Sequence, residues 1–330
     1  MSITRRNLGK LAALAIPGAA ALLAKPNSQF HGVQIGVITY SFRALKSTAE
    51  ETLRYCLDCG ISGIELMSNV AEGFAGAPMP AGRGGFGGPG GPRPPGRTVP
   101  TPEMLEARRK ASEEVTKWRV GASMDKFKAF RKMYEDAGVK IYAFKLPPTM
   151  EMADAEYEYI WNVAETLGAS HVTMELPTDD GLMQRVGEYA AKRKLAIAFH
   201  THGQGGASGF EKALAISKYT ALNLDVGHYY GVNGQSPVPV IEKYHDRIAS
   251  LHLKDRKGPA AASENRGPGG GGPNMPWGQG ETPLKEVLQL LKKRKFRIPA
   301  SIEYEYDTPA GSDELTEIKK CVEYCRNALA

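Results

Sequence analysis

The stretch Ala221–His228, with the sequence ALNLDVGH, is a short apolar run that ends in an acid and a histidine. A second stretch, Ala249–Asp255 (ASLHLKD), ends in a histidine, a lysine and an acid. Short runs of this kind, bounded by glycine or polar residues, are typical of β-strands. Helical patterns lie between them and on either side, so both stretches belong to a chain of alternating strands and helices.

Eight strands of this kind are predicted in the whole chain. They are Gln34–Thr39, Gly63–Met67, Lys140–Lys145, His171–Leu176, Ala196–His200, Ala221–Val226, Ala249–Leu253 and Ala300–Glu305. The predicted helices are Thr48–Cys59, Met124–Ala137, Ala153–Leu167, Leu182–Arg193, Gly209–Lys218, Val238–His245, Thr282–Lys295 and Glu314–Leu329. This alternation predicts an α/β protein of the (β/α)₈ TIM barrel type. A Rossmann fold would need a glycine-rich turn after the first strand, and the segment Thr39–Arg43 has none.

The 330 residues fit one barrel domain, predicted over residues 33–329, with two insertions. The insertions are residues 73–120, after the second strand, and 258–278, after the seventh. Gly and Pro make up 17 of the 28 residues from Gly73 to Pro100 and 11 of the 21 from Gly258 to Gly278, so we expect mobile loops in both stretches. Thr101–Val120 is a charged helical pattern. We expect this helix and the loop that ends in Trp277 to form a lid; an exposed linker or a contact with a second subunit is the alternative.

Residues 1–24 have the features of a signal peptide that is removed from the mature protein. Arg5 and Arg6 precede the apolar stretch Leu11–Ala24 and resemble a twin-arginine export signal, with an ordinary signal peptide as the alternative. We therefore expect a periplasmic or otherwise exported protein. No apolar run reaches the length of a membrane span, so no stable membrane insertion is expected after cleavage.

Charge and cysteine content narrow the expected partners. Arg5, Arg6 and Lys10 supply three of the six net positive charges, and no basic stripe interleaved with aromatic residues follows, so nucleic acid is not expected as a partner. Self-association is left open. The four cysteines, in two predicted helices, are compatible with disulfides, with a thiolate zinc site or with small buried side chains, of which the last is favoured.

Polar side chains collect at the carboxyl ends of the predicted strands, where TIM barrels build their active sites. They are Glu65, Lys145, Glu175, His200, His202, Asp225, His228, His252, Lys254, Asp255, Glu303 and Glu305. Carboxylates together with imidazoles favour a divalent transition metal such as Mn, Co, Zn or Fe, whereas Mg or Ca sites use oxygen ligands almost exclusively. Two other histidines are interpreted differently: His171 as structural, because it begins a strand, and His245 as a surface residue.

Six motifs resemble the xylose isomerase-like barrels of the sugar phosphate isomerase/epimerase group. They are Gly63–Leu66 (GIEL), Phe199–Gly203 (FHTHG), Leu222–His228 (LNLDVGH), Arg247–Asp255 (RIASLHLKD), Trp277–Glu281 (WGQGE) and Ile302–Glu305 (IEYE). The resemblance covers about residues 33 to 329. It implies a TIM barrel that holds a divalent metal and deprotonates a carbon next to a carbonyl.

Carried over by position, the resemblance implies the metal ligands His200, Asp225, His252 and Glu303. The family usually has a glutamate where this chain has His200, so Glu175 is the substitute candidate. Catalytic roles would fall to Glu303, as ligand and base, and to Glu175, His228 and Lys254. Substrate contacts are expected from Glu65, His202 and Trp277. Two of these have an alternative reading: an ion pair inside the barrel mouth for Glu65, and orientation of His200 for His202. Lys145 is interpreted as a solvated loop lysine or a phosphate binder.

The expected activity is isomerisation or epimerisation of a carbohydrate, either a free sugar or a keto-sugar, because phosphosugars are scarce outside the inner membrane. A lyase or dehydratase acting on an oxidised sugar is the alternative, since β-elimination also begins with carbanion formation. A non-catalytic sugar-binding barrel is a more remote one. A phosphodiesterase like endonuclease IV is disfavoured, because the ends of the second and third strands carry Glu65 and Lys145 in place of histidines.

Overall fold

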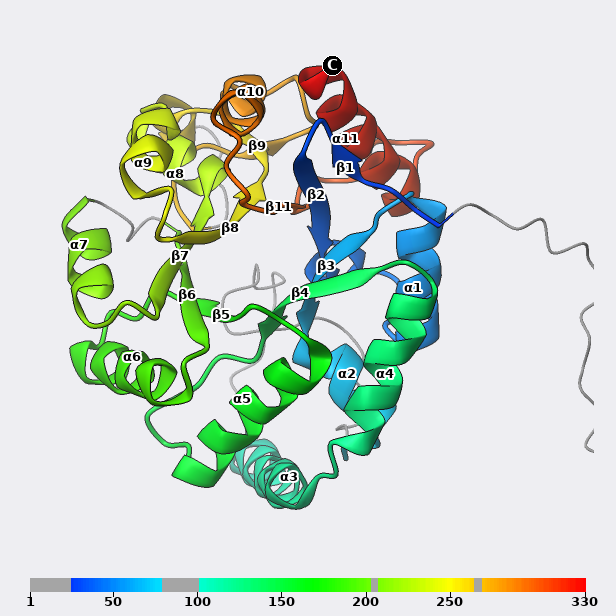
Figure 1. The fold of residues 1–330 in the computed structure, drawn as a ribbon, viewed down its shortest axis with the longest axis vertical. Helices are drawn as coiled ribbons and strands as arrows, with labels where there is room; N and C mark the ends of the chain where they lie inside the picture. The colour runs from blue at the N-terminus through cyan, green and yellow to red at the C-terminus, as the bar shows by residue number, and fades with distance from the viewer. Residues whose placement is uncertain (1–24, 79–100, 203–206, 264–268) are drawn as a thin grey trace, which may run out of the picture.

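The computed structural model describes residues 25–78, 101–202, 207–263 and 269–330. Eight parallel strands form one sheet, and its two outer parallel strands, β2 and β3, also pair with each other, so the sheet closes into a barrel (Figure 1). The barrel strands are β2 (Val33–Ile38), β3 (Gly63–Met67), β4 (Lys140–Lys145), β5 (His171–Glu175), β6 (Ala196–His200), β7 (Thr220–Asp225), β8 (Ile248–Leu253) and β11 (Ala300–Ile302). The predicted (β/α)₈ barrel is confirmed.

A layer of helices surrounds the barrel (Figure 1). Its members are α1 (Ala49–Asp58), α2 (Ser68–Ala75), α4 (Asp125–Asp136), α5 (Asp154–Leu167), α6 (Asp180–Arg193), α7 (Ala207–Ala215), α8 (Val226–Asn233), α9 (Val238–Tyr244), α10 (Leu284–Arg294) and α11 (Glu314–Leu329). Capping residues next to several of these helices determine where they begin and end. The Thr48 side chain accepts a hydrogen bond from the backbone N–H of Glu51 and caps α1, and Gly168 ends α5 at a φ of 76°.

Several short elements were not predicted. Three are strands: β1 (Gln29–Phe30) pairs with β2, and β9 (Asp255–Arg256) pairs with β10 (Asn274–Met275). The others are the 3₁₀ turns η1 (Thr39–Phe42) and η2 (Pro259–Ser263) and the helices α2 and α8. Helix α8 follows β7 without a loop because the Asp225 carboxylate caps it, accepting from the backbone N–H of His228 at 2.7 Å. The β9–β10 pairing also corrects the prediction of a loose second insertion, because residues 269–278 fold back onto the barrel rim.

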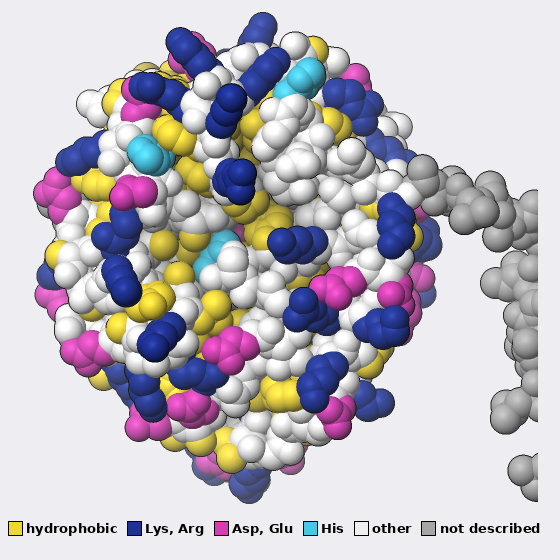
Figure 2. All heavy atoms as spheres, viewed as in Figure 1, with side chains coloured by type: hydrophobic (Ala, Val, Ile, Leu, Met, Phe, Trp, Pro, Cys, Tyr) yellow, Lys and Arg dark blue, Asp and Glu magenta, His cyan; other side chains and the backbone are white. Residues whose placement is uncertain are grey.

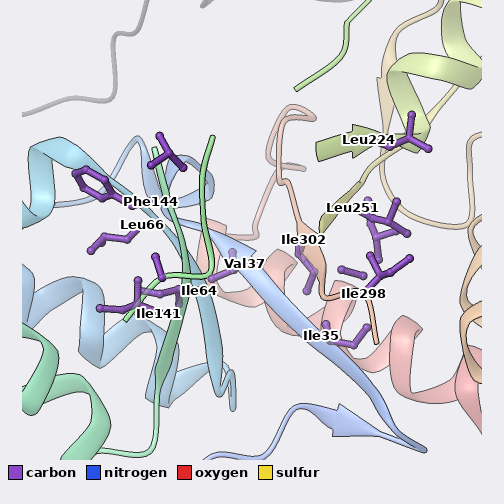
Figure 3. Close-up of a cluster of buried hydrophobic side chains, with 14 of the residues drawn as sticks. Ile35, Val37, Ile64, Leu66, Ile141, Phe144, Leu224, Leu251, Ile298 and Ile302 are labelled. Carbon is purple, nitrogen blue, oxygen red and sulfur yellow. The ribbon is translucent and has the colours of Figure 1, made fainter. Parts of the chain in front are cut away.

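The hydrophobic core lies between the barrel and the helices. Alternate strand residues point outward, and Figure 3 shows them as a row of branched and aromatic side chains on neighbouring strands. Examples are Ile35, Val37, Ile64, Leu66 and Phe144, all at most 1% exposed. Each such buried side chain contributes about 1.5–3 kcal/mol of transfer free energy. This layer holds the strands in register and so positions what they carry on their other face.

The inward face of the barrel is polar or small. Strand β8 shows the alternation: Leu251 and Leu253 belong to the outer core, whereas Ser250 and His252 hydrogen bond to residues of other strands across the interior. Gly36 of β2 has no side chain because the Tyr142 ring fills that position; an added Cβ would lie 2.4 Å from the Tyr142 hydroxyl. The interior is therefore a column of hydrogen-bonding groups.

Helix α3 (Pro102–Gly121) confirms the charged helix predicted in the first insertion. The Thr101 side chain caps it, and Pro102 begins it. Arg119 fastens it to α2 through Glu72, with nitrogen–oxygen distances of 2.7 and 3.1 Å, and lies 3.9 Å from Glu156 of α5. Figure 1 shows α3 beside α5 in the outer layer. This position contradicts the part of the lid prediction that concerns the helix, because these contacts hold it to neighbouring helices.

The four cysteines, Cys56, Cys59, Cys321 and Cys325, are free and buried, so the interpretation as small buried side chains is confirmed. On the face in Figure 2, charged side chains of both signs surround a more apolar middle. Among the described residues, no helix is long and apolar enough to cross a membrane. The predicted signal peptide, residues 1–24, lies outside the described residues.

Candidate active site

Four of the predicted residues meet at the carboxyl ends of the strands. His200, Asp225, His252 and Glu303 are all buried, and one nitrogen or oxygen atom from each lies within 4.8 Å of the others. They come from β6, β7, β8 and the residue after β11. The group thus joins segments that lie up to 103 positions apart in the chain, as predicted from the strand ends.

Neighbouring side chains prepare His200 to act as a ligand. Its Nδ1 lies 2.9 Å from the Oδ1 of Asn223, whose amide nitrogen donates to Glu65 and to Ser250. Because the amide oxygen can only accept, His200 carries its proton on Nδ1. Burial lowers the pKa of His200 to about 3, so the ring is neutral. Its Nε2 is left with a free lone pair, 3.9 Å from the Oδ2 of Asp225.

Asp225 has one oxygen that the protein leaves without a hydrogen bond. Its Oδ1 accepts from the backbone N–H of His228, whereas its Oδ2 is buried and has no hydrogen-bond partner. Lys254 Nζ lies 3.0 Å from Oδ2 as an ion pair. Burial raises the pKa of Asp225 to about 6, against the opposing effect of Lys254. A buried carboxylate oxygen without a hydrogen bond is costly; here the Lys254 ammonium compensates its charge, and the oxygen remains available as a ligand to a metal cation.

His252 lies between two carboxylates. Its Nε2 is 2.7 Å from the Oε2 of Glu65 and its Nδ1 is 2.6 Å from the Oε2 of Glu303. Burial opposes charge on this ring, but the two carboxylates outweigh burial and raise the pKa of His252 to about 10. Glu65 therefore turns Nδ1 toward Glu303 and the other ligands, an arrangement common around metal-binding histidines.

Glu65 itself is fully buried and both of its oxygens are used inside the protein. Oε1 accepts from Thr173 at 2.7 Å, and Oε2 faces Asn223 and His252. Burial would raise the pKa of Glu65, but His252 lowers it to about 2. This geometry favours the second of the two sequence interpretations, an internal ion pair, over a substrate contact.

Lys254 is a buried cation at the mouth of the site. Its Nζ lies 3.0 Å from Glu303 Oε2 and 2.6 Å from Glu305 Oε2, in addition to Asp225. Burial alone would lower the pKa of Lys254, but these carboxylates raise it above its usual range. The ammonium group therefore stays charged and partly neutralises the carboxylates.

Glu175 lies beside the four-residue group and is not part of it. Its Oε1 accepts from Lys145 at 2.9 Å, and its Oε2 lies 3.5 Å from His202 Nε2. Burial would raise the pKa of Glu175, but Lys145 and the histidines lower it to about 2. The geometry favours His200 over Glu175 as the fourth ligand. Lys145, paired with Glu175 and mostly buried, is not the solvated loop lysine of the first interpretation.

The remaining predicted residues lie around this centre or away from it. His202 is partly exposed, and its ring lies 4.8 Å from that of His200 and 4.3 Å from that of His228. Trp277 packs edge-on against Tyr324 of α11, at 5.6 Å, and the described contacts give it no partner among the histidines. The three rings of His200, His202 and His228 form a second group with metal-compatible spacing.

His171 and His245 lie where the sequence placed them. His171 Nε2 is 3.0 Å from Ser250 Oγ in the barrel interior, and burial lowers the pKa of His171 to about 4. His245 is exposed and stacks on Phe296 at 4.4 Å. Both predictions, a structural and a surface histidine, agree with these positions.

Three residues that orient the ligands were missed: Asn223, Ser250 and Thr173. Each stands two positions before a predicted site residue on the same strand. Side chains two positions apart on a strand point to the same face of the sheet. The positions two residues before the predicted site residues could therefore have been predicted to face the barrel interior as well.

The donor set fits a divalent transition metal. Asp225 Oδ2 accepts no hydrogen bond and lies 3.9 Å from His200 Nε2, and His252 and Glu303 offer one nitrogen and one oxygen that share a hydrogen bond. Two imidazole nitrogens with two carboxylate oxygens are typical ligands of Mn, Co, Zn or Fe.

Comparison with known proteins agrees with the barrel fold. Residues 182–328 match the model of the family described as xylose isomerase-like TIM barrel. Over 78 residues, or 22% of this chain, the sequence is 32% identical to inosose dehydratase from Clostridium botulinum. The chain spans about a quarter of the length of the curated relatives it matches, 26%.

Solved structures with the same fold include a 3-keto-D-glucoside 4-epimerase from E. coli, 10% identical with a TM-score of 0.54 over 89% of this chain and 99% of that one. A probable 3-DHS dehydratase from Bacillus anthracis is 15% identical, with a TM-score of 0.57 over 88% and 98%. A sugar phosphate isomerase/epimerase from Parabacteroides distasonis is 18% identical, with a TM-score of 0.56 over 89% and 95%. The resemblance predicted from the sequence is confirmed over residues 182–328, which match the xylose isomerase-like TIM barrel family, and the described chain has the TIM barrel fold.

Proposed function

We propose that this chain is a metal-dependent isomerase or epimerase that removes a proton next to the carbonyl of a sugar or keto-sugar. The observation that carries the proposal is the buried group His200, Asp225, His252 and Glu303, in which the Oδ2 of Asp225 accepts no hydrogen bond. A divalent metal held by these four residues would stabilise the negative charge that develops on the carbonyl oxygen.

Two carboxylates are placed to move the proton. Glu175 ends β5, and Glu303 follows β11, which is four strands away in either direction around the eight-stranded barrel. They therefore reach the mouth from opposite walls. Burial opposes ionisation of both groups, but Lys145 keeps the pKa of Glu175 below its usual range, and Lys254 and His252 do the same for Glu303, so both carboxylates are ionised at neutral pH. One removes the proton from one face of the carbon, and the other, once protonated, returns a proton to the opposite face.

Lys254 and His228 supply donors for substrate oxygens. Lys254 is charged and bonded only to carboxylates that face the site, so it can donate to a hydroxyl or carbonyl oxygen. His202, at the edge of the site and partly exposed, adds a further ring at the entrance. A carbohydrate, with many hydroxyl groups, suits this lining of ionised and hydrogen-bonding side chains.

A dehydratase acting on an oxidised sugar is the second candidate. Its support is the 78-residue similarity to inosose dehydratase and the shared fold of a probable 3-DHS dehydratase. Elimination begins with the same proton removal and then needs a donor for the departing hydroxyl, a role that the Lys254 ammonium group can fill. The two reactions differ in their products, which makes them easy to separate.

The test is turnover of keto-sugars and 3-oxo-glycosides in D₂O by the metal-loaded protein, with products identified by NMR and mass spectrometry. Epimerisation or isomerisation gives an isomer with deuterium at the reacting carbon, whereas elimination gives a product lighter by one water. Metal content is measured on the same samples. Absence of both turnover and deuterium exchange across the panel, with metal bound, would overturn the proposal.

We also propose that residues 1–24 direct export, on the basis of Arg5 and Arg6 ahead of an apolar run. Fractionation of cells that express the full chain tests this. The Arg5→Lys/Arg6→Lys variant is expected to stay in the cytoplasm if the signal is of the twin-arginine type. Equal export of both proteins would favour an ordinary signal peptide, and retention of both would contradict export.

A further inference from the structure

Arg256 is a buried guanidinium that the catalytic proposal does not use. It lies in β9, two positions after Lys254, and is 0% exposed. The described residues give it no ion-pair partner. It donates instead to the backbone carbonyls of Gly270, at 2.7 Å, and Gly272, at 2.5 and 3.0 Å, and to the Nδ1 of His228. A buried cation without a carboxylate is costly to keep, so its contacts call for an explanation.

The contact with His228 settles which ring nitrogen carries the proton. A guanidinium group has only donors, so the Nδ1 of His228 must accept with its lone pair. The neutral ring then has its proton on Nε2. This atom lies 4.0 Å from the Oδ2 of Asp225, on the side of the metal-ligand group. His228 therefore presents an N–H to the site and no lone pair.

This tautomer decides between the two histidine groups. A metal ligand needs an unprotonated nitrogen, and Arg256 occupies the unprotonated one of His228. The group of His200, His202 and His228 therefore does not form a metal site of its own, although its spacing would allow one. His228 is left as a hydrogen-bond donor.

The same guanidinium holds part of the second insertion against the ring. Gly269 has a φ of 70°, and a Cβ added there would lie 2.7 Å from the His228 Cε1 and 3.2 Å from the His202 Cβ. Gly272 is similarly close to the Lys257 carbonyl, where an added Cβ would lie at 2.4 Å. Glycine lets this backbone reach the two rings. The His228 ring is thus confined between the guanidinium and the glycine-rich backbone.

We propose that Arg256 is a positioning residue that fixes His228 as an Nε2–H donor to a substrate oxygen and fastens residues 269–272 as a wall of the site. The role toward substrate rests on the proposed function. The tautomer of His228 and the attachment of the segment do not, because they follow from hydrogen bonds within the chain.

The test is ¹⁵N NMR of protein labelled at histidine, which distinguishes protonated from unprotonated ring nitrogens, with His228 assigned from a His228→Gln variant. We expect an unprotonated Nδ1 and a protonated Nε2 for His228 in the unmodified protein. Arg256→Met should abolish this pattern and lower kcat/KM about 100-fold, the effect of removing one oriented donor. Arg256→Lys keeps a donor and should restore part of both.

Arg247→Met is the matched control. Arg247 also donates to backbone carbonyls, those of Leu214, Ser217 and Thr220, but just before β8, at the opposite end of the barrel. Its loss should lower stability and leave the His228 signals unchanged. If Arg256→Met does not fold, Gly269→Ala displaces the segment while keeping the guanidinium, and should shift the His228 and His202 signals.

Two results would overturn the inference: a protonated Nδ1 in the unmodified protein, or identical His228 signals in the unmodified protein and Arg256→Met. Failure of every keto-sugar to react would overturn the proposed function and leave the NMR result standing, so the two failures are distinguishable.

Discussion

The two ends of the barrel interior use the same residue types for different purposes. At the amino ends of the strands, His171 contacts the hydroxyl groups of Ser170 and Ser250, at 2.9 and 3.0 Å. At the carboxyl ends, His252 lies between Glu65 and Glu303. Both rings are buried and both point inward from a strand. They differ in their partners.

The partners decide the charge of each ring. Hydroxyl groups do not compensate the cost of burying an imidazolium, so the pKa of His171 falls to about 4 and the ring stays neutral. Two carboxylates more than compensate that cost for His252, whose pKa rises to about 10. At the amino ends of the strands, the lower end of the interior, the side chains thus form a closed hydrogen-bonded network, which we call the plug. At the carboxyl ends, the upper end, they form a cluster of charged groups to which a cation can bind.

The largest expected effect comes from Asp225→Ala at the upper end. The change removes one of the two carboxylate ligands, so bound metal should be lost. The kcat/KM should fall by about three orders of magnitude or more, since a metal supplies several kcal/mol of charge stabilisation. Metal analysis of the purified variant, alongside kinetics, checks this. Unchanged metal content would show that the site assignment is wrong.

A smaller effect is expected for Glu65→Gln, which keeps the shape beneath the ligands and removes the charge. The His252 ring loses its anionic acceptor, so metal affinity should fall about 10–100-fold. Competition with a chelator of known affinity measures it, and the fold is monitored by circular dichroism. If Glu65 instead contacts substrate, KM should change while metal affinity stays as it was.

At the lower end, His171→Gln is expected to change the acid stability. The pKa of His171 is about 4 in the folded chain against 6.5 as its ordinary value, so the unfolded chain binds the proton first as pH falls. Stability from this group is full above pH 6.5 and is lost as pH falls toward 4, by about 3 kcal/mol in total. Urea unfolding of metal-free protein at pH 7 and pH 4 should therefore show a smaller loss for the variant. An equal loss in both proteins would contradict the shift.

The smallest effect is expected from Ser301→Ala, which removes the partner of the Tyr142 hydroxyl in the lower interior. One lost hydrogen bond should cost about 1 kcal/mol of unfolding free energy. Metal content and kcat/KM should stay within about twofold, because the plug only supports the strands. A loss of metal comparable with that of Glu65→Gln would mean that the two ends are coupled.

The described part of the second insertion differs from what its composition predicted, whereas helix α3 of the first agrees with the helix predicted there. Mobile loops were predicted for the glycine- and proline-rich stretches Gly73–Pro100, of which residues 79–100 lie outside the described residues, and Gly258–Gly278. Helix α3 of the first belongs to the outer layer through Arg119, and residues 269–272 of the second are held by Arg256. A low-complexity composition indicates that a segment cannot form a hydrophobic core of its own. It does not indicate whether one arginine, such as Arg119 within α3 or Arg256 just before the second insertion, will attach the segment to the rest of the protein.

The sequence by itself determined the barrel and the membership of the site. The strands Gly63–Met67, Lys140–Lys145 and Ala196–His200 were predicted with their observed bounds, because strand signals are local. The side chains at strand ends were predicted to converge because every parallel strand of a closed barrel ends at one rim. Neither inference needs a contact between distant residues.

Only the tertiary structure decided the roles within that rim. Glu65 changes from a candidate substrate contact to the orienting partner of His252 because these residues, 187 positions apart, face each other across the barrel. His228 becomes a donor because Arg256 reaches its Nδ1. The protonation state of a buried group depends on the charges and donors packed around it, and those neighbours come from every strand. A sequence places each group on the rim, but the packed barrel decides which proton it carries.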